Sequence, residues 1–269
     1  VFIDQPVAIS TSTTAVDADC NGDSTGSATV SASGGTPAYT FQWDANAANQ
    51  PTATAIGLSA GKYFVTVSDN NGCATVDSAT VDEPTAIVAS ISASTDPSCN
   101  GGTNGSATVS ATGGTGAYTF QWDLNASSQM TATATGLGDG TYVVTVTDAN
   151  GCSDTSAVSL TEPAALTIAT DSLANISCNG ANDGFIRVAG NGGTPPYTYS
   201  WGVPTGDTRT NLSQGSYTVT ITDANSCTNS QTFVITEPTV LTVSLAVIDE
   251  QCDGNDDGEI TATPAGGTT

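Results

Sequence analysis

Short segments of the chain alternate between apolar and polar residues, and this alternation predicts β-strands. Between residues 27 and 32, for example, polar Thr29 and Ser31 separate three apolar residues. Successive side chains of a strand point to opposite faces, so a two-residue period gives each segment one buried face. The side chains expected to point inward in the first group of segments are Ala28, Val30, Ala32, Tyr39, Phe41, Trp43, Tyr63, Val65, Val67, Ala79 and Val81.

Glycine-rich turns separate these segments. Two adjacent glycines precede each aromatic segment, at 34–35, 113–114 and 192–193, and Asn-Gly pairs lie at 71–72 and 150–151. Asn-Gly favours tight hairpins, and glycine accepts backbone conformations that other residues disfavour. Six or seven short strands in about 79 residues predict an all-β fold of the immunoglobulin-like β-sandwich type.

The whole pattern repeats along the chain. Trp43, Trp122 and Trp201 are evenly spaced, because 122 − 43 equals 201 − 122, and each repeat closes on a Glu-Pro pair. Self-similarity at a fixed period, here about 79 residues, predicts tandem domains. The expected segments are the end of a preceding repeat (1–6), repeat 1 (7–84), repeat 2 (85–163), repeat 3 (164–238) and the start of a truncated fourth repeat (239–269).

The recurring aromatic residues are expected in the core of each sandwich. Each tryptophan continues an inward alternation, which favours core packing over an exposed platform for stacking sugars. Tyr63, Tyr142 and Tyr217 end Leu-x-x-Gly-x-Tyr segments that resemble a tyrosine corner, in which the phenol bonds back to the backbone. Because no Gly/Ser linker separates the repeats and a proline follows each closing strand, we expect little hinge freedom and an elongated rod.

The charge balance argues against several classes of function. Three Lys+Arg residues stand against 26 Asp+Glu residues, a formal net charge of −23. Nucleic acid and anionic bilayers would be repelled, and no apolar run reaches the roughly 18 residues that span a membrane. Histidine, the most frequent general base, does not occur in the sequence. Adjacent carboxylates such as Asp256 and Asp257 come with no cleft signature, so we expect no enzyme.

Seven cysteines recur at the repeat spacing and predict disulfides, which form in an oxidising compartment. Pairing within repeats gives Cys20–Cys73, Cys99–Cys152 and Cys178–Cys227, with Cys252 left for a residue beyond the chain end. Pairing between neighbouring repeats gives Cys73–Cys99, Cys152–Cys178 and Cys227–Cys252 and leaves Cys20. We favour the first scheme, because a small domain with few large aliphatic side chains needs a disulfide of its own for stability. Its difficulty is that the two cysteines of one repeat are expected at opposite ends of the sandwich.

Several motifs recur in the same order in the repeats. They occur at Cys99-Asn100-Gly101, at Gly192-Gly193-Thr194-Pro195-Pro196-Tyr197, and from Gly140 to Cys152, before a Glu-Pro pair. Together these motifs resemble the SprB repeat. Ser226 replaces glycine in the third repeat, and Asp253 replaces asparagine in the fourth. The resemblance implies a very large, repetitive cell-surface protein of Bacteroidetes-type bacteria, exported by the type IX route and used as a gliding adhesin or surface filament. It supplies no catalytic residues.

Two further kinds of site are candidates. Asp253, Asn255 and Asp257 fit the opening of a calcium loop, although Pro264 occupies the position of its closing glutamate, and a solvated polar turn is the alternative. No other cofactor is expected. Three serines lie in Asp-Ser triplets that look like the O-glycosylation sites of such bacteria, and unmodified hydroxyls are the alternative. They are Ser24, Ser78 and Ser172.

Two functions follow from these features. The favoured one is an extracellular structural stalk or filament segment of an adhesin, whose partners are further repeats of the same chain or identical chains in a fibre. The alternative is that the repeats themselves bind glycans or proteins through the variable loops 45–52, 124–131 and 202–208. Binding of the purified protein to a glycan array would distinguish the two.

Overall fold

The computed structural model describes residues 5–203, 205–251, 254 and 258–268. The described residues form tandem immunoglobulin-like β-sandwiches in which the strand pairs are antiparallel. By compactness the chain divides into two units, residues 1–95 with 105–160 and residues 96–104 with 161–269. The segment of repeat 2 that carries Cys99 therefore belongs to the second unit, together with repeat 3.

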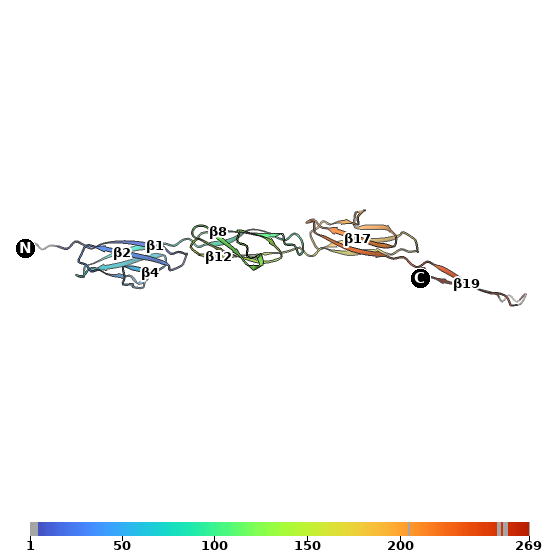
Figure 1. Cartoon of the computed structure of the whole chain (residues 1–269), viewed down its shortest axis with the longest axis horizontal. Helices are drawn as coiled ribbons and strands as arrows, with labels where there is room; N and C mark the ends of the chain where they lie inside the picture. The colour runs from blue at the N-terminus through green and yellow to red at the C-terminus, as the bar shows by residue number, and fades with distance from the viewer. Residues whose placement is uncertain (1–4, 204, 252–253, 255–257, 269) are drawn as a thin grey trace, which may run out of the picture. The chain divides into compact units, whose positions relative to one another are not determined.

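Repeat 1 consists of two sheets that enclose one core (Figure 1). One sheet has the order β1-β2-β4 and the other has the order β3-β5-β6, so the chain changes sheet after β2, β3 and β4. The Gly-Gly turn follows β2, and the Asn-Gly turn joins β5 to β6. The bounds are β1 (Ser10–Val16), β2 (Gly26–Ser33), β3 (Thr40–Trp43), β4 (Thr54–Leu58), β5 (Gly61–Ser68) and β6 (Ala74–Val81).

Repeats 2 and 3 have the same sheet orders, β7-β8-β10 with β9-β11-β12, and β13-β14-β16 with β15-β17-β18. The bounds in repeat 2 are β7 (Val88–Thr95), β8 (Gly105–Thr112), β9 (Thr119–Trp122), β10 (Thr133–Leu137), β11 (Gly140–Thr147) and β12 (Ser153–Leu160). Those in repeat 3 are β13 (Thr167–Ala174), β14 (Gly184–Asn191), β15 (Thr198–Ser200), β16 (Thr208–Leu212), β17 (Gly215–Thr222) and β18 (Thr228–Ile235). After repeat 3, β19 (Thr242–Ile248) pairs with β20 (Glu259–Ala265).

The loops after the tryptophans differ in length, because Tyr142 follows Trp122 by 142 − 122 = 20 positions whereas Tyr217 follows Trp201 by 217 − 201 = 16. A 3-10 helix follows β3 and β9, as η1 (Ala45–Ala47) and η2 (Leu124–Ala126). In repeat 3 a loop without a 3-10 helix among its described residues occupies the same place. The length change is therefore confined to a surface connection and leaves the strands intact.

The core of each sandwich surrounds its tryptophan. Trp43 and Trp122 are 0% and 1% exposed, and Trp201 is 8% exposed. In repeat 1, the residues of the alternating segments that are buried are Ala28, Val30, Trp43, Tyr63, Val65, Val67, Ala79 and Val81, and those packed against them while partly buried are Ala32, Tyr39 and Phe41. Large side chains are few, so each core depends on one tryptophan and a ring of small aliphatic residues.

Candidate functional site: the junctions between repeats

Each repeat carries its first cysteine in a loop directly after its first strand. We name this the first-cysteine loop (residues 17–25, 96–104 and 175–183). In repeat 1, Asn21 Nδ2 donates hydrogen bonds to Glu83 Oε1 (2.9 Å) and to the carbonyl oxygen of Pro84 (3.1 Å). The backbone N–H of Gly22 donates to Glu83 Oε2 (2.7 Å). The Cys-Asn-Gly and Glu-Pro motifs are thus two parts of one structure, at the end of the sandwich where the chain leaves it.

The same arrangement recurs in the other repeats. In repeat 2, Glu162 accepts hydrogen bonds from Asn100 Nδ2 and from the backbone N–H of Gly101, both at 2.6 Å. In repeat 3, Glu237 accepts one from the backbone N–H of Gly180 at 2.9 Å. Bonds from N–H groups to a carboxylate are stronger than neutral ones, so the glutamate fixes the loop that carries the cysteine.

The second cysteine of each repeat lies in a tight hairpin shaped by a buried aspartate. We name this the second-cysteine hairpin (residues 69–73, 148–152 and 223–227). In repeat 2, Asp148 Oδ1 accepts from the backbone N–H groups of Asn150 (3.0 Å) and Cys152 (2.9 Å), and Oδ2 accepts from that of Thr115 (2.8 Å). The aspartate therefore joins the hairpin to the Gly-Gly turn and positions the cysteine.

These hydrogen bonds explain the ionisation of the buried aspartate. The bond from the Thr115 N–H, with those from Cys152 and Asn150, holds the pKa of Asp148 below its usual value of 3.8. Burial opposes this shift in the pKa, because it disfavours the charged form, but the backbone donors, which include Gly151, together outweigh it. Asp148 is consequently a carboxylate at any pH near neutrality.

Disulfides join one repeat to the next rather than closing each repeat. Cys20 of repeat 1 is bonded to Cys152 of repeat 2, and Cys99 of repeat 2 is bonded to Cys227 of repeat 3. The Cα–Cα distance is 5.7 Å in both bonds, within the usual range. Each bond links a first-cysteine loop to the second-cysteine hairpin of the following repeat.

The predicted pairing within repeats is therefore wrong for Cys20–Cys73, Cys99–Cys152 and Cys178–Cys227, and the pairing Cys73–Cys99 is also absent from the described bonds. Cys73 and Cys178 are free and exposed. Cys252 lies outside the described residues.

The strand order gives the physical reason for this pairing. In repeat 1, β2 begins just after the first-cysteine loop and ends at the Gly-Gly turn, where Thr36 N donates to Asp69 of the second-cysteine hairpin (2.9 Å). Cys20 and Cys73 thus lie at opposite ends of an eight-residue strand. Such a strand is about 23 Å long, whereas the Cα atoms of a disulfide lie within about 7 Å. One repeat cannot close on itself, but its far end meets the near end of the next.

Side-chain hydrogen bonds accompany each disulfide. Asn150 Nδ2 donates to the carbonyl oxygen of Asp19 (2.9 Å), beside Cys20. Asn225 Nδ2 donates to the carbonyl oxygen of Ser98 (3.0 Å), beside Cys99. The asparagine two positions before the second cysteine, which Gly151 follows in repeat 2 and Ser226 follows in repeat 3, therefore has a function that its turn propensity did not reveal.

The segment between consecutive repeats is held against the Gly-Gly turn. In repeat 2, the backbone N–H of Gly114 donates to the carbonyl oxygen of Thr85 (2.8 Å). Gly113 has φ +75°, and a β-carbon there would overlap the carbonyl oxygen of Ala86. Glycine is required at this position by both its backbone conformation and the close approach of the linking segment.

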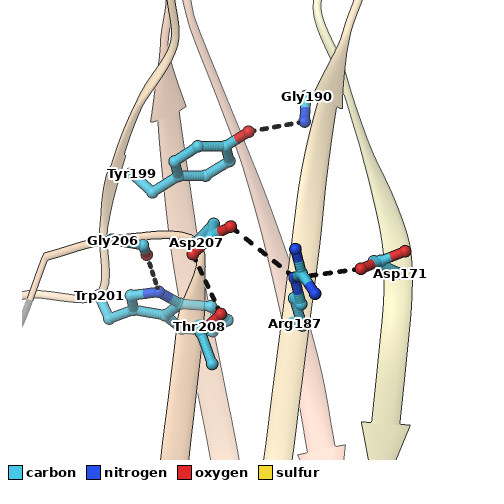
Figure 2. Close-up of polar contacts among 8 residues, drawn as sticks. All are labelled: Asp171, Arg187, Gly190, Tyr199, Trp201, Gly206, Asp207 and Thr208. Atoms are coloured by element: carbon cyan, nitrogen blue, oxygen red, sulfur yellow. Dashed lines mark hydrogen bonds and ion pairs between the residues drawn. The ribbon is translucent and has the colours of Figure 1, made fainter.

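The tryptophans are occupied by contacts inside their own repeats. Trp43 Nε1 donates to Thr52 O (3.0 Å) and Trp122 Nε1 to Thr131 O (2.9 Å). Figure 2 shows the equivalent bond of Trp201, from Nε1 to the carbonyl oxygen of Gly206 (2.8 Å). Buried rings with satisfied N–H groups fit core packing better than a sugar-stacking platform.

Tyr63, Tyr142 and Tyr217 each donate from the phenol to the carbonyl four residues upstream, at 2.8, 3.1 and 2.9 Å. Tyr63 and Tyr142 are buried, and Tyr217 packs against its core while partly buried. The three tyrosines thus make the backbone hydrogen bond of a tyrosine corner.

Repeat 3 also carries a charged cluster that the other repeats lack at the equivalent positions. Arg187 Nε lies 3.1 Å from Asp171 Oδ2 and 3.8 Å from Asp207 Oδ2, as Figure 2 shows. All three side chains are about half exposed. Exposed ion pairs contribute little to stability, so this cluster is a local feature of the sheet surface.

The remaining sequence candidates are three serines and one calcium loop. Ser24 and Ser172 are exposed, and Ser78 is half-buried in β6. They stay predictions as glycosylation sites. The calcium candidates Asp253, Asn255 and Asp257 lie outside the described residues.

The junction contains functional residues that sequence reasoning did not assign. The buried aspartate stands four positions before each second cysteine. The asparagine after the first cysteine donates to the closing glutamate in repeats 1 and 2 and to the carbonyl oxygen of Pro238 in repeat 3. The aspartate and the asparagine both recur at fixed positions of the motifs. The spacing of the aspartate from the second cysteine could have predicted its role, because Asp side chains commonly accept hydrogen bonds from backbone N–H groups within a few residues.

Each of the three repeats matches the model of one known family. The sequence model of the SprB repeat matches residues 12–48, 91–127 and 170–205, one match in each repeat. The resemblance to this family is thereby confirmed. No curated protein shows significant similarity to the chain.

The solved structures to which the chain is similar are distant in sequence. The three N-terminal domains of the bacteriophage RB49 highly immunogenic outer capsid protein are 12% identical, with 84% of this chain and 96% of that chain covered and a TM-score of 0.40. Sidekick-1 immunoglobulin domains 1–5 are 11% identical, with 87% and 60% covered and a TM-score of 0.34. The eight N-terminal Ig domains of Down Syndrome Cell Adhesion Molecule are 13% identical, with 87% and 35% covered and a TM-score of 0.35. The chain spans less than two thirds of the last two.

No helix in the described part of the chain has the length and apolar character needed to cross a membrane.

Proposed function

Because the chain carries three SprB repeats, we propose that it is a structural stalk or filament segment of a large, repetitive bacterial cell-surface adhesin. The observation that carries the proposal is the double covalent joining of consecutive repeats. At both junctions the peptide link is accompanied by a disulfide between the two repeats. Two attachments restrain a junction more than one linker does, which suits a part that transmits force or holds a tip at a distance.

The chemistry of the chain supports an extracellular position. Disulfides persist in oxidising compartments, and a net charge of −23 keeps a surface protein soluble and apart from nucleic acid and anionic lipid. The likeness to SprB repeats extends the proposal to export by the type IX route and to surface attachment in gliding. We assign no catalytic role to the chain.

Small-angle X-ray scattering tests the stalk directly. A strand of about seven residues with its end loops gives each repeat roughly 35–40 Å, so three repeats in a rod extend about 110 Å and have a radius of gyration of about 32 Å. A compact globule of 269 residues has a radius of gyration of about 18 Å. We expect the larger value, increasing with each added repeat. A radius of gyration close to that of the compact globule would contradict the stalk.

Ligand binding is the competing function, and one assay separates it. The oxidised chain would be applied to a glycan array and to extracellular matrix proteins. A spacer binds neither above background. Specific binding that is lost when the loop at 202–208 is exchanged for the loop at 124–131 would favour the binding-module function instead.

A further inference from the structure

The two free cysteines of the described residues occupy the two complementary positions of a junction. Cys73 lies in a second-cysteine hairpin, and Cys178 lies in a first-cysteine loop. Both are exposed, whereas the four bonded cysteines are half-buried. The bonded counterparts are Cys152 and Cys227 for Cys73, and Cys20 and Cys99 for Cys178.

The hairpin around Cys73 already has the geometry of a bonded one. Asp69 Oδ1 accepts from the backbone N–H of Cys73 at 2.9 Å, the same distance as between Asp148 and Cys152. Asn71 Nδ2 donates to Thr36 Oγ1 at 2.9 Å. Its counterpart in repeat 3, Asn225, donates to Thr194 Oγ1 in the same way. Asn225 also donates to the carbonyl oxygen of Ser98 in the preceding repeat.

The loop around Cys178 is preformed in the same way. The backbone N–H of Gly180 donates to Glu237 Oε2 (2.9 Å), and that of Ser177 donates to Asp183 Oδ1 (3.1 Å). The second bond matches the one from Ser98 to Asn104 Oδ1 (3.0 Å) beside the bonded Cys99. The carbonyl oxygen of Ser177 therefore corresponds to the carbonyl oxygen of Ser98, which accepts the hydrogen bond from Asn225 across the bonded junction.

The groove beside Cys73 also resembles the groove of a bonded junction. At the bond between Cys99 and Cys227, a groove of about 410 Å³ is lined by both cysteines and by the linking segment 164–166. Beside Cys73, a groove of about 410 Å³ is lined by the hairpin and by the linking segment 5–9. The linking segment and the hairpin are in place there, and the loop of another repeat would complete the groove.

We propose that Cys73 and Cys178 are the two halves of one further junction, and that each forms a disulfide with the complementary cysteine of another SprB repeat. Cys73 takes a partner from a first-cysteine loop, and Cys178 takes one from a second-cysteine hairpin. The side-chain amide of Asn71 and the carbonyl oxygen of Ser177 supply the accompanying hydrogen bond. This goes beyond the proposed function, because it depends on junction geometry and holds wherever the chain is located.

Bond formation needs a disulfide oxidant, for which oxidised glutathione suffices. The thiolate of one cysteine attacks a sulfur of glutathione disulfide, which gives a mixed disulfide and releases one reduced glutathione. The second cysteine then attacks the protein sulfur of the mixed disulfide and releases the other. Two protein thiols are oxidised and one glutathione disulfide is reduced to two thiols.

A tandem duplication of the chain tests the proposal. Residues 1–238 are followed directly by a second copy of residues 7–269. Repeat 3 of the first copy then precedes repeat 1 of the second copy, so that Cys178 of the first copy and Cys73 of the second copy can form one complete junction. We call these two residues the inner Cys178 and the inner Cys73. The second copy carries Cys252→Ser, because the first copy ends before that residue. After oxidation in glutathione buffer, free thiols are alkylated under denaturing, non-reducing conditions and peptides are mapped by mass spectrometry. We expect a linked peptide joining the inner Cys178 to the inner Cys73, and two alkylated cysteines, as in the single chain.

The matched control replaces Cys73 of the second copy by serine, which should return Cys178 of the first copy to the alkylated fraction. Alkylation of both inner cysteines in the unsubstituted duplication would overturn the proposal. Pairing of the inner Cys178 with any other cysteine would also overturn it. Neither result would alter the scattering test, so failure here and failure of the stalk remain distinguishable.

Discussion

Removal of one junction disulfide should destabilise the two repeats that it joins and leave the third unchanged. The perturbation is the double substitution Cys99→Ser with Cys227→Ser. In the bonded chain, repeat 3 is attached to repeat 2 twice, through the backbone at Ala164 and through Cys227. If repeat 3 unfolds alone, the segment between these two points is a closed loop, whose length is 227 − 164. The substitution opens that loop.

The chain-entropy model gives the size of the effect. Closing a loop of about 63 residues lowers the entropy of the unfolded segment by about 14 cal/mol/K, or about 4 kcal/mol at 25 °C. Repeat 3 should therefore lose about 4 kcal/mol of unfolding free energy, although its core is untouched. A similar loop restrains repeat 2, which another disulfide also joins to repeat 1. Repeat 1 should not change.

Native-state hydrogen exchange measured by mass spectrometry resolves the repeats separately. A loss of about 4 kcal/mol corresponds to about a 1,000-fold larger opening constant, so amides of β17 and β18 should exchange about 1,000-fold faster. The matched control is Cys20→Ser with Cys152→Ser, which should leave β17 and β18 unchanged. A loss below about 1 kcal/mol in repeat 3, or an equal loss in the control, would refute the loop-closure reasoning.

Three further predictions concern the structures that hold the cysteines. Gly113→Ala should destabilise repeat 2 by at least about 2 kcal/mol in calorimetry, because φ +75° strains a β-carbon that also overlaps the Ala86 carbonyl; Gly101→Ala, with φ +70° and open space around it, should cost less. Asp148→Asn should cost about 1–3 kcal/mol in denaturant unfolding, since an amide cannot accept from Thr115 and from the hairpin together, and wild-type stability would contradict this. Because the folded pKa of Asp148 lies below its unfolded value of 3.8, its stabilisation is present above that pH and declines as the pH falls below it. Thermal midpoints measured from about pH 5 down to about pH 2.5 should therefore fall less steeply in Asp148→Asn, and parallel curves would argue against this assignment.

Local features of the sequence were sufficient for the strands and the repeat. Alternation along residues 63–67 and a glycine pair at 34–35 each reflect the geometry of a few consecutive residues. The position of Trp122 in the core follows from the same alternation. The strands, the turns and the core residues can therefore be predicted without knowing how consecutive domains contact one another.

The disulfide pairing could not be read in this way. A constant repeat period makes several pairings equally regular, and parity does not choose among them. The choice depends on strand order, which places Cys20 at one end of β2 and Cys73 at the other. It also depends on which ends of consecutive sandwiches come together. The role of Asp148 was hidden for a related reason, since one of its partners, Thr115, is distant in sequence.

The two disulfides close covalent rings that overlap along the chain. One ring runs from Cys20 to Cys152 and the other from Cys99 to Cys227, so residues 99–152 belong to both. Hydrolysis of any single peptide bond between Cys20 and Cys227 therefore leaves the two fragments covalently joined. Even if a protease excised a stretch between Cys99 and Cys152, the flanking pieces would stay connected by both disulfides. A nick that would sever an ordinary string of domains would leave this one continuous.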